Sequence, residues 1–283
     1  MLAIGSLTII LLVLSVTPLI ADAHFKQAES LCQAGRWSEA ARNYEKAITF
    51  APYWSIYHLR LGMAYEEMSV AAPGQEQHLQ ASEHEYESVL RLAGPHAYSF
   101  LGLARTAAMR VQFFGGSKDT GRAYCRLAAA SDPNNPAVRH AVGLVYLELG
   151  DLPQAELEMR RAVELLPTAE SYADLGIVLR ELGRYDEAIQ FLRSATAFDP
   201  DSAGLLTELG ITFGEAGRPG EAVAAFEEAI VLSPRNIAAH LNYARALAMI
   251  GRTREAISEY NLVLRMDPEN RAARQGLESL GLG

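Results

Sequence analysis

A twenty-residue segment of this chain returns at intervals of 34 residues. ELGRYDEAIQFLRSATAFDP spans residues 181–200, and it reappears as EAGRPGEAVAAFEEAIVLSP at 215–234 and as MIGRTREAISEYNLVLRMDP at 249–268. Related copies upstream end at Pro52 and Pro167. A fixed period of this length indicates one supersecondary unit stacked on copies of itself, because a single such unit cannot bury its own apolar face.

Each unit is expected to fold as two helices joined by a tight turn. In the first unit quoted, the pattern predicts helices over about 169–182 and about 185–198. Gly183 ends the first helix, because glycine adopts a left-handed backbone at little cost, and Pro200 ends the second, because proline has no N–H to donate. Matching stops are Gly35, Gly150, Gly217 and Gly251, and Pro52, Pro133, Pro167, Pro234 and Pro268. Residues suited to cap the following helix are Thr168, Ser202, Asn236 and Asn270.

Small and large residues alternate where the two helices of a unit must approach each other. A glycine inside a helix costs about 1 kcal/mol relative to alanine, so its return at one position needs a packing reason. Small residues opposite large ones let two helices mesh closely. The small positions are Gly62, Gly102, Gly143, Gly176 and Gly210 in first helices, and Ala40, Ala155, Ala188, Ala222 and Ala256 in second helices. The large partners include Tyr44, Tyr86, Leu192, Phe226 and Tyr260.

The period, the glycines, the alanines, the aromatic position and the terminal proline together resemble the tetratricopeptide repeat family. The resemblance implies an all-α fold, a right-handed α-solenoid of about seven helix-turn-helix repeats with a C-terminal capping helix. It covers most of 24–283. The expected repeats are 21–54, 55–94, 95–135, 136–168, 169–202, 203–236 and 237–270, with a cap over 271–283.

Two units depart from the common length. SVAAPGQEQ, starting at Ser69, lengthens the link between the helices of the second unit, and RVQFFGGSKDTG, starting at Arg110, lengthens that of the third. Insertions in repeat arrays map to loops and often to the working surface. Phe113 and Phe114 therefore either anchor a partner or seal the lengthened helix against the solenoid.

Composition limits the class of protein. The chain has 283 residues, of which 49% are hydrophobic and 21% charged, and a net charge of −9. That balance fits a folded protein and disfavours a nucleic-acid partner, which needs a basic surface. Cys32 and Cys125 stand in no CxxC spacing and lie within apolar helical patterns, so they are expected to be small buried hydrophobic residues.

The N-terminal segment, residues 1–23, carries no charge before Asp22. Its apolar core from Leu7 to Val16 fits a secretory signal peptide, and Ala21 and Ala23 supply an A-x-A cleavage site. The expected location is therefore exported, either periplasmic or secreted. No Lys or Arg follows Met1, as a signal peptide would normally have, so an uncleaved membrane anchor over residues 2–21 and a misassigned start are the alternatives.

No arrangement for chemistry stands out. GGSKDTGRA, starting at Gly115, approaches a phosphate-binding loop, but Arg122 and Ala123 replace the required Lys and Ser or Thr, and no strand precedes it. His78 and His84 are six residues apart and lie on different helix faces. The chain is therefore expected to be no enzyme and to need neither metal nor cofactor.

The resemblance implies that the first helix of each unit lines a concave wall. Inward residues should lie opposite the tight glycine, at spacings of four and three. The apolar strip at the middle positions either faces a partner or packs against the neighbouring helix. The candidate groove residues are Leu59, Met63, Leu103, His140, Leu144, Ile177, Arg180, Thr207, Ile211, Leu241 and Arg245.

These features predict a non-enzymatic scaffold that binds a protein or peptide in its groove. The alternative is a docking or regulatory subunit of a separately encoded enzyme or envelope-assembly complex. A membrane partner is expected only if the N-terminal segment stays uncleaved.

Overall fold

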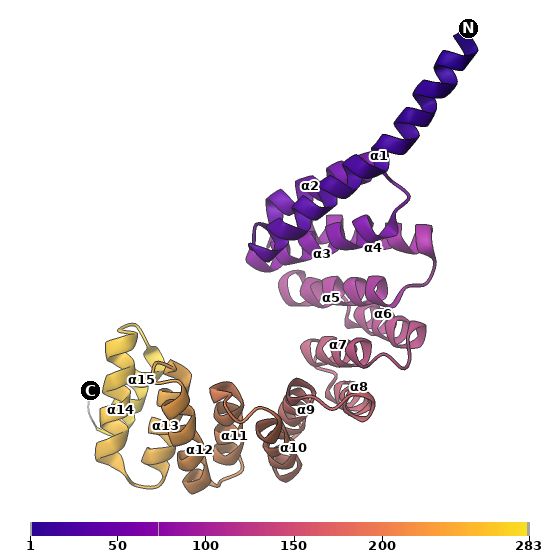
Figure 1. Ribbon diagram of the computed structural model, residues 1–283. Coiled ribbons are helices and arrows are strands. Elements are labelled where there is room, and N and C mark those ends of the chain that lie inside the picture. Colours follow the sequence, from indigo (N-terminus) through magenta and orange to yellow (C-terminus); the bar gives the residue numbers. More distant parts are fainter. Residues whose placement is uncertain (1, 73, 282–283) are drawn as a thin grey trace. The chain divides into compact units, whose positions relative to one another are not determined.

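The computed structural model describes residues 2–72 and 74–281, and the side chains of 16–72 and 74–281. Every regular element of the described residues is an α-helix, fifteen in all (Figure 1). This confirms the predicted all-α array of about seven helix-turn-helix repeats with a capping helix. The chain divides into two compact units, Met1–Asp151 and Leu152–Gly283.

The first unit contains seven helices, in which α1 packs on α2, α3 on α4 and α5 on α6. Consecutive pairs then stack through α2 on α3, α4 on α5 and α6 on α7. The helices are α1 (Leu2–Gln33), α2 (Trp37–Phe50), α3 (Ser55–Ala71), α4 (Glu76–Ala93), α5 (Ala97–Phe114), α6 (Lys118–Ser131) and α7 (Pro136–Glu148).

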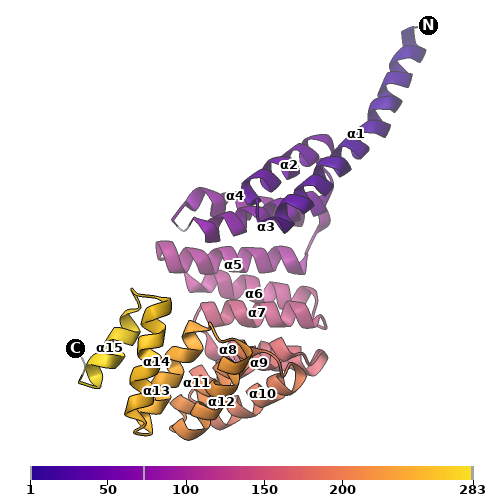
Figure 2. The same cartoon turned by 60° about the vertical axis from the view of Figure 1, so that its left-hand side comes forward.

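The second unit repeats the same packing, with α9 on α10, α11 on α12 and α13 on α14 (Figure 2). α8 packs on α9 at one end and α15 closes the other end against α13 and α14. The helices are α8 (Leu152–Leu165), α9 (Ala169–Glu181), α10 (Tyr185–Phe198), α11 (Ala203–Glu215), α12 (Pro219–Leu232), α13 (Ile237–Met249), α14 (Thr253–Met266) and α15 (Arg271–Ser279).

Glycine makes the turn inside each pair. At Gly183, φ is +74°, a conformation that side-chain-bearing residues rarely adopt. The amide of Gly183 donates to Arg180 O at 2.8 Å and that of Arg184 donates to Leu179 O at 2.9 Å, so the last carbonyls of α9 are satisfied. α10 can therefore fold back along α9 after only three connecting residues, 182–184.

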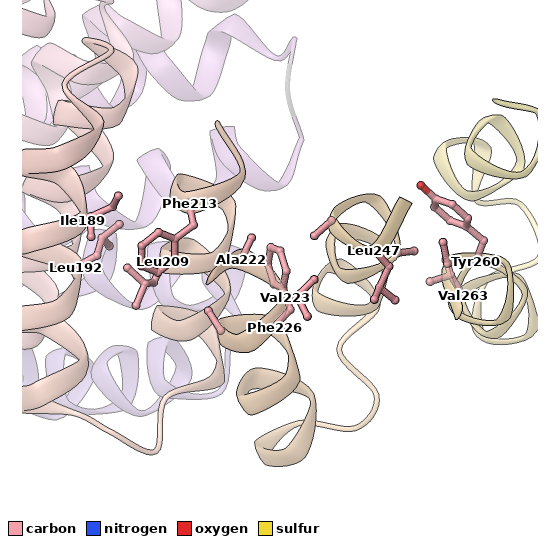
Figure 3. Packing of buried hydrophobic residues seen from close by; sticks show 14 of the residues in the cluster. Ile189, Leu192, Leu209, Phe213, Ala222, Val223, Phe226, Leu247, Tyr260 and Val263 are labelled. Atoms are coloured by element: carbon pink, nitrogen blue, oxygen red, sulfur yellow. The ribbon is translucent and has the colours of Figure 1, made fainter. Parts of the chain in front are cut away.

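The core of the second unit is built by large side chains laid on glycines. A Cβ added at Gly210 would stand 2.6 Å from Phe226 Cε1, and one at Gly176 would stand 2.8 Å from Leu192 Cγ. Figure 3 shows Leu192, Phe226 and Tyr260 in the row of apolar side chains between successive helices. The predicted meshing of small against large residues is therefore what holds each helix pair together.

In several of the loops that join successive repeats, a side chain of the next helix bonds to the carbonyl oxygen of the proline. We call this contact the latch. His58 Nε2 lies 3.1 Å from Pro52 O, His240 Nε2 lies 3.1 Å from Pro234 O, and Arg139 Nε donates to Pro133 O at 2.9 Å. Each donor stands six residues after its proline, on the first or second turn of the next helix. The carbonyl that the broken helix leaves unsatisfied thus gains a partner, which sequence reasoning had missed.

The two lengthened units absorb their extra residues mainly in helix. α3 and α4 have 17 and 18 residues and α5 has 18, whereas α9 and α10 of the second unit have 13 and 14. The expected longer links are therefore largely extra helical turns. Pro73, inside the first insertion, lies outside the described residues.

The first helix is much longer than its partner, because α1 has 32 residues and α2 has 14. α1 passes through Pro18 without a break. Residues 1–15, most of the segment expected to be a signal or an anchor, have side chains outside the described set. Among the residues whose side chains are described, 16–72 and 74–281, no helix combines the length and apolar character needed to cross a bilayer.

Candidate partner-binding surface

The candidate groove residues are distributed over both units. Leu59, Met63, Leu103, His140 and Leu144 belong to the first unit and the other six to the second. Met63 and Arg245 are exposed. The half-buried members are Leu59, His140, Leu144, Ile177, Arg180, Ile211 and Leu241.

Three candidates are poorly placed to meet a partner. Leu103 and Thr207 are buried, and the Thr207 hydroxyl donates to Ala203 O at 2.7 Å within its own helix. The Arg180 side chain is 12% exposed, and its Nη1 donates to Glu208 Oε2 at 2.6 Å. The polar groups of Thr207 and Arg180 are therefore already bonded within the repeat array. A partner would have little access to these three side chains, because neighbouring helices cover them.

The accessible stripe lies one residue further along each helix at two of its three positions. On α13 the predicted inward residues are Leu241 and Arg245, and the expected spacing of three continues the series to Ala248. The residues that line a cavity are Asn242, Arg245 and Met249. The middle residue is shared. The outer two shift because one residue turns a helix by about 100°, which carries a side chain from the seam onto the open face.

The same register applies to the helices before it. Ala173 and Thr207 are buried, while the next residues, Asp174 and Glu208, are partly exposed. We call this surface of the second unit the A-helix stripe. Its residues are Asp174, Ile177 and Glu181 on α9, Glu208, Ile211 and Glu215 on α11, and Asn242, Arg245 and Met249 on α13.

A cavity of about 470 Å³ opens on the stripe between α11 and α13. Ile211 and Met249 give it apolar walls, and Glu215, Asn242 and Arg245 place polar groups at its border. Met249 is 61% exposed, which is high for a large apolar side chain. An opening with apolar walls and a few polar groups at its border suits an apolar side chain on a charged segment.

The first unit carries a smaller, more polar cavity of about 140 Å³ around Met63. Arg60 Nε lies 3.4 Å from Glu29 Oε1, and Glu67 and Arg105 complete the charged border. The motifs visible in the sequence, its glycines and prolines, give no sign of these arginines. Only the stacking of α1, α3 and α5 brings their side chains together.

Glu66 forms the buried floor of this cavity. Its Oε1 lies 2.7 Å from Arg105 Nε, and its Oε2 accepts a 2.7 Å hydrogen bond from the Tyr86 hydroxyl. Burial raises the pKa of the Glu66 carboxyl, although Arg105 and Tyr86 act in the opposite direction. The arrangement ties α3, α4 and α5 together.

The two loop aromatics lie at the end of α5. Phe113 is 42% exposed and Phe114 is 40% exposed, so each ring is partly covered. Their role as anchors for a partner stays a prediction. Of the two cysteines, Cys125 is buried and Cys32 half-buried, and no disulfide joins them.

Stacked helix-turn-helix pairs of this kind define an α-helical repeat protein. Three sequence models, each described as tetratricopeptide repeat, match residues 22–52, 141–203 and 215–280. The chain belongs to the tetratricopeptide repeat family. Proteins of this family are generally protein-binding scaffolds and typically non-catalytic.

Solved structures share the fold at low sequence identity. PilW, described as a widely conserved type IV pilus biogenesis factor, is 16% identical with a TM-score of 0.64, over 79% of this chain and 98% of that one. PilF of Pseudomonas aeruginosa is 14% identical with a TM-score of 0.61, over 80% and 97%. No curated protein matches the sequence.

A chain of the APC/C hetero-tetramer Cut9-Hcn1 is 21% identical with a TM-score of 0.59. The match covers 80% of this chain and 42% of that one, so this chain spans less than half the length of that relative. At these identities the structures share the fold alone.

Proposed function

We propose that this chain is a non-enzymatic scaffold that binds an apolar peptide segment with basic flanks across α11 and α13. The cavity between Ile211 and Met249 carries this proposal, because it presents apolar walls on an otherwise polar surface. Family membership supports a protein or peptide as the partner. The absence of a catalytic motif from the sequence supports a role without chemistry.

Charge selects the kind of peptide. The A-helix stripe carries four acidic residues, Asp174, Glu181, Glu208 and Glu215, and one basic residue, Arg245. Arg180, beside the stripe, pairs with Glu208 at 2.6 Å and lies 3.7 Å from both Glu181 and Glu215, so the stripe keeps an excess of negative charge. A ligand with Lys or Arg on either side of an apolar residue would complement this surface, because opposite charges steer association and fix register.

Site-specific photo-crosslinking tests the surface directly. A photo-reactive phenylalanine derivative at Met249 is expected to yield a covalent adduct with the partner in cells. Val231 is the matched control, since it lies on α12 and is 78% exposed, yet lines no part of the cavity. Adducts at Val231 that equal those at Met249 would refute the assignment.

A second measurement separates apolar from ionic recognition. Ile211→Glu is expected to reduce the Met249 adduct strongly, because it places a charge where an apolar side chain should sit. Raising the salt concentration is expected to reduce the adduct too, because screening weakens contacts between exposed charges. An adduct that persists under both conditions would place the partner elsewhere.

We further propose that the N-terminal segment directs the chain to a membrane for export, so that the repeats meet their partner outside the cytoplasm. The uncharged run over residues 2–21 supports this. Fractionation of cells expressing the full chain tests it, and recovery of the protein solely with soluble cytoplasmic enzymes would contradict it.

A further inference from the structure

The loop between α2 and α3 differs from most of the other loops that join successive repeats. In most of the other loops, a residue one or two positions after the proline caps the next helix, and His96 before α5 is the other exception. The side chains of Asn135, Thr168, Ser202, Asn236 and Asn270 all accept a backbone hydrogen bond there. Trp54 holds that position before α3 and makes no such bond. At this position the sequence has Trp54, whose indole side chain does not cap α3, in place of a residue that would stabilise the helix start.

The same loop exposes other large apolar side chains. Tyr53 is 82% exposed and Trp54 is 55% exposed, and Phe50 and Ile56 are exposed beside them. No charged residue occurs from Ala47 to Tyr57. We call residues 50–56 the aromatic loop. Several corresponding loops carry a charge beside their proline, as at Asp199, Arg235 and Glu269.

The latch described above holds the aromatic loop in place. His58 bonds to Pro52 O with one ring nitrogen and lies 2.6 Å from Glu85 Oε2 with the other. The Trp54 ring stacks on Tyr57, with centroids 5.6 Å apart. Tyr53 and Trp54 are thus held at the surface by a fixed backbone, as pre-organised contact residues would be.

The aromatic loop lies beside α1 at the point where the charged part of that helix ends. Ala21 is 0% exposed and packs in one cluster with Ala47, Ala51 and Tyr57. The His24 ring stacks on Phe50 at 6.0 Å. Asp22 is the first charged residue of the chain, so α1 is uncharged on the N-terminal side of this contact.

The uncharged run of α1 has the length of a membrane span. Residues 2–21, at 1.5 Å rise per residue, extend about 30 Å, which matches the hydrocarbon thickness of a bilayer. The described side chains nearest the loop, Val16 and Leu19, are exposed. The remaining residues of the run are apolar or small, apart from Ser6, Thr8, Ser15 and Thr17.

The folded repeat also retains the expected cleavage site. Ala21, Asp22 and Ala23 lie within α1, and cleavage after Ala23 would remove Ala21 from its cluster with Ala51 and Tyr57. The first repeat therefore uses a residue that a cleaved protein would lack. This contact favours retention of the segment.

We propose that residues 2–21 stay attached as a helix embedded in the bilayer, and that the aromatic loop lies in the lipid headgroup region beside it. Trp and Tyr favour this region, because their rings pair an apolar body with a polar tip. The loop adjoins the end of the apolar run, so it would lie at the membrane surface where that helix leaves the bilayer. The loop would then fix how the repeats stand relative to the membrane.

The two tryptophans of the chain provide the test. Trp54 lies in the loop, and Trp37 begins α2 at the opposite end of the helix pair, about 20 Å away for a 14-residue helix. The full chain carrying Trp37→Phe reports on Trp54, and the chain carrying Trp54→Phe reports on Trp37. Both are reconstituted in phosphatidylcholine vesicles, with or without lipids brominated near the headgroup.

Brominated lipid is expected to quench about half of the Trp54 emission and to leave most of the Trp37 emission. The Trp54 emission should also shift to the blue in vesicles. Equal quenching of the two residues would overturn the proposal. So would a Trp54 that stays open to water in vesicles and becomes protected only when a partner protein is added.

Two further measurements test the supporting steps. Intact mass spectrometry of the protein from cell membranes is expected to include residues 2–21, and a chain beginning at His24 would overturn the anchor. Trp54→Asn, which restores the cap found in other repeats, is expected to be at least as stable to urea as the original. Clear destabilisation would show that Trp54 serves packing instead of lipid contact.

Discussion

The hydroxyl of Tyr86 donates a 2.7 Å hydrogen bond to Oε2 of Glu66, and both side chains are buried between helices of the first unit. Arg105, from α5, lies 2.7 Å from the other carboxylate oxygen. The Glu66 carboxylate is thus part of the packing of α3, α4 and α5. Its burial makes the stability of this unit depend on pH.

Glu66→Gln should change how stability varies with pH. Burial raises the pKa of Glu66 above 4.5, so the folded protein binds its proton more tightly than the unfolded chain does. The stability of the original relative to Glu66→Gln should be greatest below pH 4.5 and fall as pH rises through the raised pKa. Urea denaturation of both proteins over this range measures it, and a difference that grows with pH would contradict the prediction.

His58→Gln should show a pH dependence in a higher range. The hydrogen bond to Glu85 is the main cause that raises the pKa of His58 above 6.5. The stability that this latch adds should therefore be complete below pH 6.5 and be lost as pH rises through the folded value. Comparing urea midpoints of the two proteins tests this. A constant difference up to strongly alkaline pH would show that the charged imidazole contributes nothing.

Two glycines of α11 should respond in opposite directions to alanine. Gly210→Ala would drive a methyl group into the Phe226 ring and should cost about 1–3 kcal/mol. Gly214→Ala meets no atom within 4 Å and should stabilise by about 0.5–1 kcal/mol, because alanine favours helix. Thermal or urea unfolding of the pair decides the matter. If both variants lose stability, close helix packing is not the reason for Gly210.

Asn270→Ala should loosen the closing helix. The Asn270 side chain accepts a 3.1 Å hydrogen bond from the Ala273 amide, and loss of such a cap costs about 1 kcal/mol. Hydrogen exchange should accelerate in α15 and, because the Tyr260 ring packs directly on Gly276, in the part of α14 beneath it. Exchange in α9 should stay unchanged, and faster exchange there would point to a global effect.

Much of the fold follows from residues that act on their own neighbours. Gly183 and Pro200 mark the ends of α9 and α10 because each restricts the backbone locally, and the expected ranges 169–182 and 185–198 lie within one residue of the observed helices. Gly210 and Phe226 are recognisable as partners because their spacing recurs every 34 residues. Both the repeat spacing and the local backbone preferences can be read directly from the sequence.

The candidate surface depended more on tertiary packing. In the second unit the middle position of each first helix, such as Ile211, lies on the A-helix stripe as expected, whereas Thr207 is buried and Glu208 takes its place. A rotation of one residue cannot be read from a repeat, since it depends on the angle at which neighbouring helices cross. The ion pair of Arg105 could not be predicted for a similar reason, because its partner Glu66 belongs to another repeat.

The order of residues by itself determined that this chain forms helical hairpins, where they turn, and which small and large side chains mesh. Those outcomes depend on short-range backbone preferences and on one repeated spacing. The tertiary structure alone decided which side chains remain accessible, that Ala21 packs beside the aromatic loop, and that Glu66 is enclosed. The exposure of a side chain depends on how the neighbouring helices pack around it. The distance between two helices in space does not follow from their separation along the chain.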